Sequence, residues 1–373
     1  MGNTGDVTHR TTLRHLLRPG MVTLLLLCAA MIVSLTGCRT PWDGAPSPGG
    51  SAHETTSPID GTTTTTEAVT RRPLAVMIEN SPSARPQSGL TDASVVYEAI
   101  TEGGITRFMA IYLHGAPAVI GPVRSIRPHF IDLAREYDAV LVHCGQSYEA
   151  LQILATNRSL YNLDQLKYAK PFWRDHSRKA PHNLYTASDK LRAFIEQCGW
   201  EQSVNNLPHF TSSEMMTTGE AATAVNISFG GLVRYDLRLL YEPQQQVYQR
   251  YMDNVQHVDR ETCQPVTAKN IIIQRVEAQQ FPTSKLHTYD VRVIGSGDGI
   301  FITAGKQIPL HWSKDSVTDI TRYTDQTGRP LPFQPGQTWI EVVPVTGAVS
   351  FGPLTPETRK GGHGRQKKLL PVQ

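Results

Sequence analysis

Apolar and polar positions divide the chain into two regions with different patterns. Between residues 72 and 215, short apolar runs alternate with segments whose apolar positions recur at helical spacing. Serine at the start of two of these segments is typical of a helix cap. We expect strands at Leu74–Glu79, Ser94–Ala99, Ile105–Tyr112 and Ala139–Cys144, and helices at Pro128–Tyr137, Ser147–Leu154 and Ser188–Gln197. This order predicts an α+β or α/β N-terminal domain with a mixed sheet.

Residues 225–357 show a different pattern. Short apolar or alternating runs are separated by turn signals such as Gly295–Gly299 and Pro335-Gly336. The expected strands are Ile227–Phe229, Gly231–Tyr241, Val247–Met252, Ile271–Arg275, Asp290–Ile294, Gly299–Thr303, Gln307–Trp312 and Thr338–Val343. These runs predict a β-rich C-terminal domain.

Residues 1–37 predict a bacterial lipoprotein signal peptide. Three arginines precede an apolar run, Met21–Leu35, that is short for a membrane span. The run ends in Leu35-Thr36-Gly37-Cys38, which has the form of a lipobox. We expect cleavage before Cys38 and diacylation of its thiol, which would make the lipid bilayer a partner through diacylglycerol and place the protein at the outer face of the bacterial cytoplasmic membrane. An ordinary signal peptide or a short membrane anchor is the alternative.

Composition distinguishes both ends of the mature chain from its body. Residues 38–71 are rich in Ser, Thr, Pro and Gly and predict a disordered linker, because few apolar groups can offset the entropy of ordering. Residues 1–37 carry three Arg and one Asp, and residues 358–373 carry five Lys or Arg, so the total of +3 leaves −4 for residues 38–357. An acidic body argues against a nucleic-acid partner. The basic tail, 358–373, is expected to be disordered, either solvated or in contact with anionic lipid or wall polymer.

Several long motifs are similar to those of the YerB-type bacterial lipoproteins. They are Pro73-Leu-Ala-Val-Met-Ile-Glu-Asn80, Val96-Tyr-Glu-Ala-Ile-Thr-Glu-Gly-Gly-Ile-Thr-Arg-Phe108, Gly121-Pro-Val-Arg-Ser-Ile-Arg127, Ala180-Pro-His-Asn183, Gly328-Arg-Pro-Leu-Pro332 and Pro335-Gly-Gln-Thr-Trp-Ile340. The resemblance covers most of residues 72–350 and implies a lipoprotein with conjoined N-terminal and C-terminal domains of unknown function. It implies no reaction, so the catalytic residues stay unknown. At position 337 this chain has Gln where the family pattern has Lys.

Two carboxylates and an arginine flank a predicted hairpin. If Gly103-Gly104 forms a two-residue turn, Ile100 lies opposite Arg107, and Glu98 and Glu102 become same-face neighbours of that arginine. The arginine would be partly buried and would need a carboxylate partner. The group is then either a structural ion-pair cluster or a ligand-binding or acid–base site.

Arg124, Ser125 and Arg127 form a second candidate group before a predicted helix. Guanidinium groups bind two oxygens of a carboxylate or phosphate at once, and a helix N-terminus favours an anion. These residues predict a site for an external anion, with an internal clamp on the glutamates as the alternative.

Four further side chains complete the candidate set. His143 ends an apolar strand and is a candidate acid–base group or ligand contact, or a structural histidine. Arg178, His182 and Asn183 lie on a polar loop that could cover the same cleft. No metal site is expected, because Cys144, Cys198 and Cys263 are scattered and the histidines lack ligand spacing.

Two classes of function remain open. The first, which we favour, is a noncatalytic envelope lipoprotein that binds a cell-wall component or an envelope protein through the anion site at Arg124 and Arg127. The second is an envelope hydrolase or transferase that uses Glu98 or Glu102 with His143. No nucleophile motif, metal signature or phosphate loop supports the second class, and no cofactor is expected.

Overall fold

The structure, a computed structural model, describes residues 53–204, 207–208, 215–231, 236–281 and 287–352. All of them belong to one unit, Ser51–Gln373. The predicted signal peptide 1–37, the lipidation residue Cys38 and the predicted tail 358–373 lie outside the described residues.

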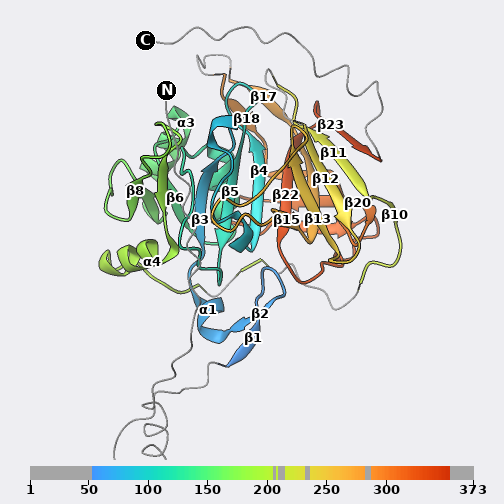
Figure 1. The fold of residues 1–373 in the computed structure, drawn as a ribbon, viewed down its shortest axis with the longest axis horizontal. Helices are drawn as coiled ribbons and strands as arrows, with labels where there is room; N and C mark the ends of the chain where they lie inside the picture. Colours follow the sequence, from blue (N-terminus) through green and yellow to red (C-terminus); the bar gives the residue numbers. More distant parts are fainter. Residues whose placement is uncertain (1–52, 205–206, 209–214, 232–235, 282–286, 353–373) are drawn as a thin grey trace, which may run out of the picture. The chain divides into compact units, whose positions relative to one another are not determined.

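The largest sheet among the described residues has eleven strands drawn from both predicted domains (Figure 1). Its order is β10 (Glu220–Ala221), β20 (Lys306–Lys314), β19 (Gly295–Thr303), β16 (Asn270–Val276), β22 (Thr338–Pro344), β4 (Val95–Ile100), β5 (Thr106–Tyr112), β3 (Leu74–Glu79), β6 (Val140–His143) and β7 (Asn162–Asp164), with β21 (Arg322–Asp325) against β20. It contains parallel neighbours (β16 with β22, β22 with β4, β3 with β6 and β6 with β7) as well as antiparallel ones, which confirms the mixed sheet. β22 is parallel to both β16 and β4, so the predicted limits at 215 and 225 mark no break in the sheet.

The central strands are buried on both faces. Every residue of β3, β4 and β5 is buried, as their nearly continuous apolar runs require. On one face Met77, Met109 and Ile111 join a core that includes Phe130 and Ile131 of helix α2. On the other face, β3 and β5 share a core with a second sheet.

The second sheet, six-stranded among the described residues, comes from the C-terminal region. It runs in the order β14 (Val255–Gln256), β13 (Val247–Met252), β12 (Leu237–Glu242), β11 (Ala224–Ser228) and β23 (Ala348–Phe351), with β15 (Thr267–Ala268) against β13. Two further pairs are β17 (Ala278–Gln280) with β18 (Tyr289–Val291) and β8 (Phe172–Arg174) with β9 (Leu184–Thr186). The described part of the C-terminal region is thus β-rich, as predicted.

Helices lie mainly in the N-terminal region. They are α1 (Thr66–Thr70), α2 (Pro128–Arg135), α3 (Tyr148–Thr156) and α4 (Ser188–Gln197), with 3-10 turns η1 (Pro82–Ala84) and η2 (Leu90–Asp92). Ser147 caps α3 as predicted, whereas Ala187 occupies the cap of α4, so the prediction for Ser188 was wrong. None of the helices in the described residues is long and apolar enough to cross a bilayer.

The end of the predicted linker is folded, which corrects the disorder expected for 38–71. Residues 54–70 form the hairpin of β1 (Glu54–Thr56) and β2 (Thr63–Thr65), followed by α1. One apolar side chain, Ile59, is fully buried in the core of the α2 face. Burial alone would raise the pKa of Asp60, but hydrogen bonds from His114, Ser94 and Thr62 hold that pKa well below its usual range. Composition missed this because the segment is fixed by one fully buried apolar side chain, Ile59, and by the hydrogen bonds of Asp60.

The glycine-rich run Gly295–Gly299 was predicted as a turn but begins strand β19. A Cβ at Gly297 would lie 2.9 Å from Nε1 of Trp312, and one at Gly299 would lie 2.3 Å from the carbonyl oxygen of Ile273. The glycines therefore allow close approach of neighbouring strands rather than a reversal of the chain.

Candidate functional site

Charged groups from β3, β5 and the loop before α2 meet at one edge of the α2 face. We call Glu79, Glu102, Arg107, Arg124 and Arg127 the arginine cluster. Glu79 and Arg107 are register partners on β3 and β5, so their side chains share a face. Three guanidinium groups face two carboxylates, which leaves one positive charge in excess.

Glu102 is held by two of these arginines. It accepts a hydrogen bond from Arg107 at 3.2 Å and forms a shorter ion pair with Arg127. Arg107 also donates to the carbonyl oxygen of Ser125 at 2.7 Å, and Arg127 donates to its neighbour Ile126. Burial and the adjacent Arg127 lower the pKa of Arg107 to about 10, so the group is still a cation at neutral pH. This part of the cluster is internally paired, as one of the two sequence interpretations expected.

Arg124 is different because the two terminal nitrogens of its guanidinium group form no hydrogen bond with the described residues. Its Nε lies 3.4 Å from Oε2 of Glu79 without forming a hydrogen bond, and its terminal nitrogens bond to none of the described residues. The side chain is 29% exposed. The excess positive charge of the arginine cluster is therefore presented to solvent here.

His182 lies on the other side of the same carboxylate. Its Nδ1 donates to Oε2 of Glu79 at 2.9 Å, and the hydroxyl of Ser81 donates to Oε1 at 2.7 Å. The imidazole is 25% exposed, and its Nε2 has no hydrogen bond with the described residues. Arg124 and His182, two of the predicted residues, thus converge on Glu79, and we call this the Arg124–His182 site. Glu79 was missed, although a carboxylate at the end of an apolar strand was a visible signal.

Glu98 does not join Arg107, contrary to the predicted hairpin. Ile100 pairs with Thr106 and Ala99 pairs with Arg107, so the connection is longer than the two glycines. A shift of one residue moves a side chain to the opposite face of a sheet. Glu98 accordingly faces the second sheet, away from the arginine cluster.

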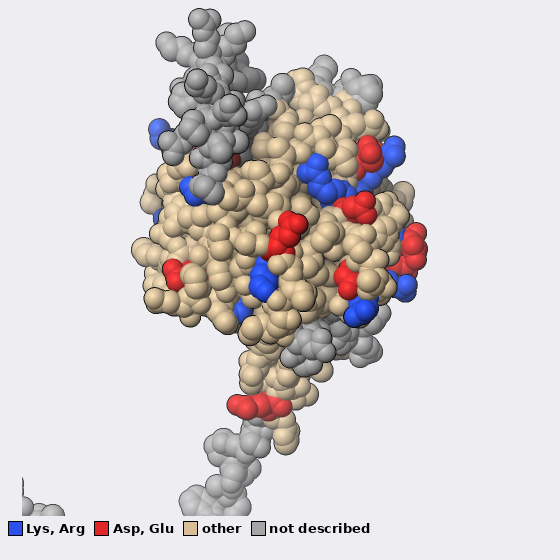
Figure 2. All heavy atoms as spheres, turned by 90° about the vertical axis from the view of Figure 1, so that its right-hand side faces the viewer, with Lys and Arg blue, Asp and Glu red and all other residues tan. Residues whose placement is uncertain are grey.

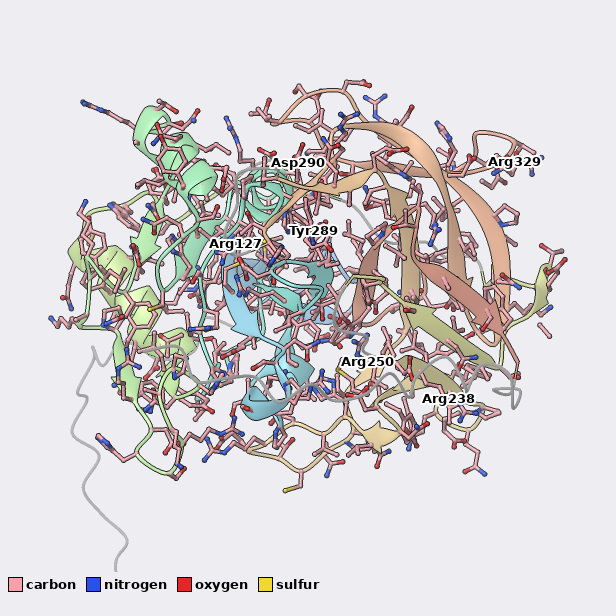
Figure 3. The ribbon with its side chains drawn as sticks, turned by 90° about the horizontal axis from the view of Figure 1, so that it is seen from above. Arg127, Arg238, Arg250, Tyr289, Asp290 and Arg329 are labelled. Carbon is pink, nitrogen blue, oxygen red and sulfur yellow. The ribbon has the colours of Figure 1, made fainter. Side chains whose placement is uncertain are left out.

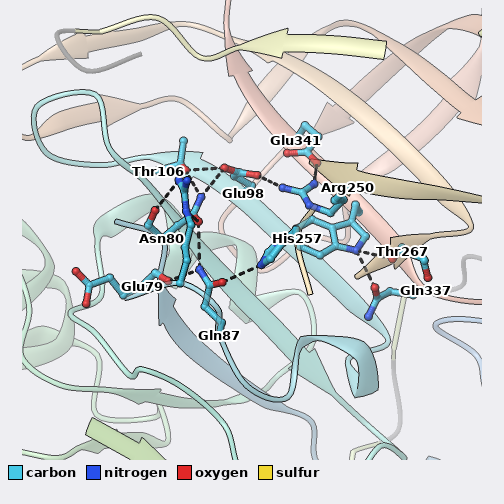
Figure 4. A network of polar contacts seen from close by, with 12 residues as sticks. Glu79, Asn80, Gln87, Glu98, Thr106, Arg250, His257, Thr267, Gln337 and Glu341 are labelled. Atoms are coloured by element: carbon cyan, nitrogen blue, oxygen red, sulfur yellow. Dashed lines mark hydrogen bonds and ion pairs between the residues drawn. The ribbon is translucent and has the colours of Figure 1, made fainter. Parts of the chain in front are cut away.

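Glu98 belongs instead to a buried network (Figure 4). Arg250 of β13 donates to Glu98 and to Glu341 of β22, both at 2.5 Å, and all three side chains are fully buried. Its guanidinium lies 3.6 Å from the ring centre of Trp339. Asn80 donates to Glu98 at 3.0 Å. We call Glu98, Arg250 and Glu341 the buried triad, and its position below the surface assigns it to the core rather than to a binding site.

Arg250 and Glu341 were not among the predicted residues. Glu341 stands in an otherwise apolar strand, and a buried carboxylate needs a partner, which was a usable signal. Nothing in the sequence pattern pointed to Arg250, since it reaches Glu98 from another sheet. Figure 3 shows Arg250 well apart from Arg127.

The remaining predicted residues support loops and the core. His143 is fully buried, where its Nδ1 donates to the carbonyl oxygen of Gly145 at 2.9 Å and its Nε2 bonds to the side chain of Asn162. Burial lowers its pKa. Arg178 donates to the carbonyl oxygens of Ala84 and Pro86 and so fixes the loop after β3.

Asn183 and Ser125 also act through local contacts. The side-chain oxygen of Asn183 accepts a hydrogen bond from Arg174 at 2.8 Å, and Ser125 offers its carbonyl oxygen to Arg107. Within the part of the chain that the structure describes, no group of three or more His, Cys, Asp or Glu side chains is arranged to hold a metal ion.

Models for a protein of unknown function, DUF3048, match the chain over most of its length. The N-terminal domain matches residues 60–201 and the C-terminal domain matches residues 200–340. The chain belongs to the DUF3048 family. A member of this family from Bacillus subtilis (strain 168), named "Putative lipoprotein YerB", is 35% identical over 338 residues, 88% of this chain and 97% of that protein. The crystal structure of YerB protein from Bacillus subtilis has a TM-score of 0.72 at 32% identity and covers 79% of this chain and 99% of that one.

These relationships confirm the resemblance to the YerB-type lipoproteins and the fold class. The side chain of Gln337 has a structural role here. The Gln337 amide donates to the carbonyl oxygens of Leu90 and Ala93, at 2.7 and 2.6 Å, and its oxygen accepts from Nε1 of Trp339 at 2.7 Å. Gln337 therefore holds the indole that stacks on Arg250.

Proposed function

We propose that this DUF3048 protein is a lipid-anchored protein of the outer face of the cytoplasmic membrane that binds an anionic ligand at the Arg124–His182 site. The relative named as a lipoprotein and the lipobox at Cys38 support the anchor. The observation that carries the ligand is the unused fork of Arg124, because a guanidinium binds two oxygens of a carboxylate or phosphate in parallel.

The charge balance supports an anion rather than a cation as the ligand. Arg107 and Arg127 carry two positive charges against the single negative charge of Glu102, and Glu79 faces both Arg124 and His182. An anion beside Arg124 would therefore balance the one positive charge that the arginine cluster has in excess. The face of the protein shown in Figure 2 carries cationic and anionic side chains interspersed, without a basic stripe that would suit nucleic acid.

The alternative acid–base set of Glu98, Glu102 and His143 gains no support. Glu98 and His143 are fully buried with their polar atoms in hydrogen bonds, and Glu102 is taken by two arginines. None of the three is free to meet a substrate that arrives from solvent.

The test measures anion binding to the unacylated mature chain (residues 38–373 with Cys38→Ser). Phosphate and glycerol 3-phosphate are titrated calorimetrically against this chain and its Arg124→Gln variant. We expect the variant to bind at least about tenfold more weakly, the loss typical of one charge-assisted pair. Arg71→Gln is the matched control, since the Arg71 side chain is 41% exposed and, among the described residues, forms its ion pair with Glu67 four residues earlier. Equal binding by Arg124→Gln and the parent chain, or no binding by either, contradicts the proposal.

A further inference from the structure

Large apolar side chains are exposed on α3 and on the loop that follows β7. Among the described residues, six large hydrophobic side chains are exposed, and three of them are Tyr148, Leu151 and Leu166, at 74%, 43% and 71%. Tyr148 and Leu151 are three residues apart on α3, so they share one face of that helix. We call these three residues the apolar strip.

Gly145 connects the apolar strip to the anion site. A Cβ at Gly145 would lie 3.5 Å from Cδ1 of Leu166 and 3.8 Å from the hydroxyl oxygen of Ser125. The backbone runs alongside as well: Cys144 N donates to the carbonyl oxygen of Arg124 at 3.1 Å, and Ile126 N donates to that of Gly145 at 3.0 Å. The segment that carries Arg124 therefore borders the loop that leads into Tyr148.

We infer that the ligand of this site is a phospholipid with an anionic phosphate head, whose head binds Arg124 and whose acyl chain lies on the apolar strip. The inference rests on the proposed function, because it uses Arg124 as the anion contact. A simple inorganic anion would leave the apolar strip unexplained, whereas an amphiphile matches both the charge and the exposed apolar surface beside it.

The chain length between the anchor and the described residues agrees with a membrane ligand. The residues from Cys38 to His53 span at most about 50 Å even when fully extended. A body tethered at that distance meets the lipids of its own membrane at high effective concentration. Lys167, next to Leu166, is fully exposed and adds a positive charge at the rim of the strip.

The experiment compares three soluble probes on the unacylated mature chain: glycerol 3-phosphate, dihexanoyl phosphatidic acid and dihexanoyl phosphatidylcholine, each below its micelle concentration. We expect phosphatidic acid to bind more than about tenfold tighter than glycerol 3-phosphate, as burial of two or three methylene groups would give. Tyr148→Ser and Leu166→Ser should remove that advantage and leave glycerol 3-phosphate binding unchanged. Val255→Ser is the control, because Val255 is 70% exposed but lies on the second sheet.

Each outcome separates the two proposals. Equal affinity for glycerol 3-phosphate and phosphatidic acid, both dependent on Arg124, overturns the lipid inference and leaves the anion site intact. Phosphatidic acid binding that survives Arg124→Gln, or phosphatidylcholine binding of equal strength, also overturns the inference, since the head would then play no part. If the parent chain does not bind glycerol 3-phosphate, the proposed function itself is contradicted.

Discussion

At the scale of single residues, the buried triad places three ionisable groups in the core. One guanidinium and two carboxylates lie fully buried together, and a buried charge without a partner is costly. Glu98 and Glu341 are register partners on adjacent parallel strands, so their carboxylates are neighbours. Burial and, next to it, the negative charge of Glu98 raise the pKa of Glu341 from 4.5 to about 8, although Arg250 opposes the shift. One proton therefore balances the triad at neutral pH.

This proton predicts a pH dependence of stability. The native protein keeps a proton on Glu341 where the unfolded chain has released it, so the contribution of Glu341 to the free energy of unfolding falls as the pH rises from 4.5 to about 8. In Glu341→Gln this fall should disappear, and the stability of the variant relative to the parent should rise by up to about 1.4 kcal/mol per pH unit. Urea unfolding at several pH values measures the difference. The exposed Glu196→Gln on α4 is the control, and parallel curves for Glu341→Gln and the parent would refute the assignment.

At the scale of elements, local pattern predicted much of the fold. The expected limits of Leu74–Glu79, Val247–Met252 and Ser188–Gln197 agree with β3, β13 and α4. Each of these segments has an uninterrupted apolar or amphipathic pattern, so its ends are visible in the sequence. The register of β4 against β5 was not predictable in the same way. It depends on how many residues the connection uses, and an error of one residue placed Glu98 on the wrong face.

The hairpin of β1 and β2 offers a test at this scale. Ile59→Ala should lower the free energy of unfolding by roughly 2–4 kcal/mol, since it removes a fully buried side chain from the main core. Thr63→Ala, at an exposed position of β2, should change stability by less than about 0.5 kcal/mol. Denaturant midpoints of the two variants provide the measurement. If Ile59→Ala left the free energy of unfolding unchanged, the result would support the disordered linker that composition predicted.

At the scale of the whole molecule, the sequence pattern indicated an α/β region and a β-rich region but not how they join. The joining depends on pairs far apart in the chain: β22 beside β4, and Arg250 beside Glu98. No local period encodes such pairs. The same holds for the candidate site, where Arg124 and His182 were predicted separately and Glu79, which brings them together, was not.

Attachment to the membrane is tested on the full-length protein. We expect Cys38→Ser to move the protein from the membrane fraction to the extracytoplasmic soluble fraction, because the proposed anchor is the diacylated thiol of Cys38. Cys263→Ser should leave fractionation unchanged, since Cys263 is an exposed free thiol in the body. Immunoblots of separated fractions provide the readout, and membrane retention of Cys38→Ser would rule out the lipid anchor.

The position of β22 between β16 and β4 sets an order of events as the chain is made from its N-terminus. β4 has β5 on one side, and the other side is filled by a strand from the C-terminal region. The carboxylate of Glu98 can meet Arg250 earlier, but the backbone edge of β4 stays unpaired until residues 338–344 are available. The incomplete chain thus carries an open, apolar sheet edge, and the rate at which β22 closes that edge limits its exposure to proteases and to aggregation.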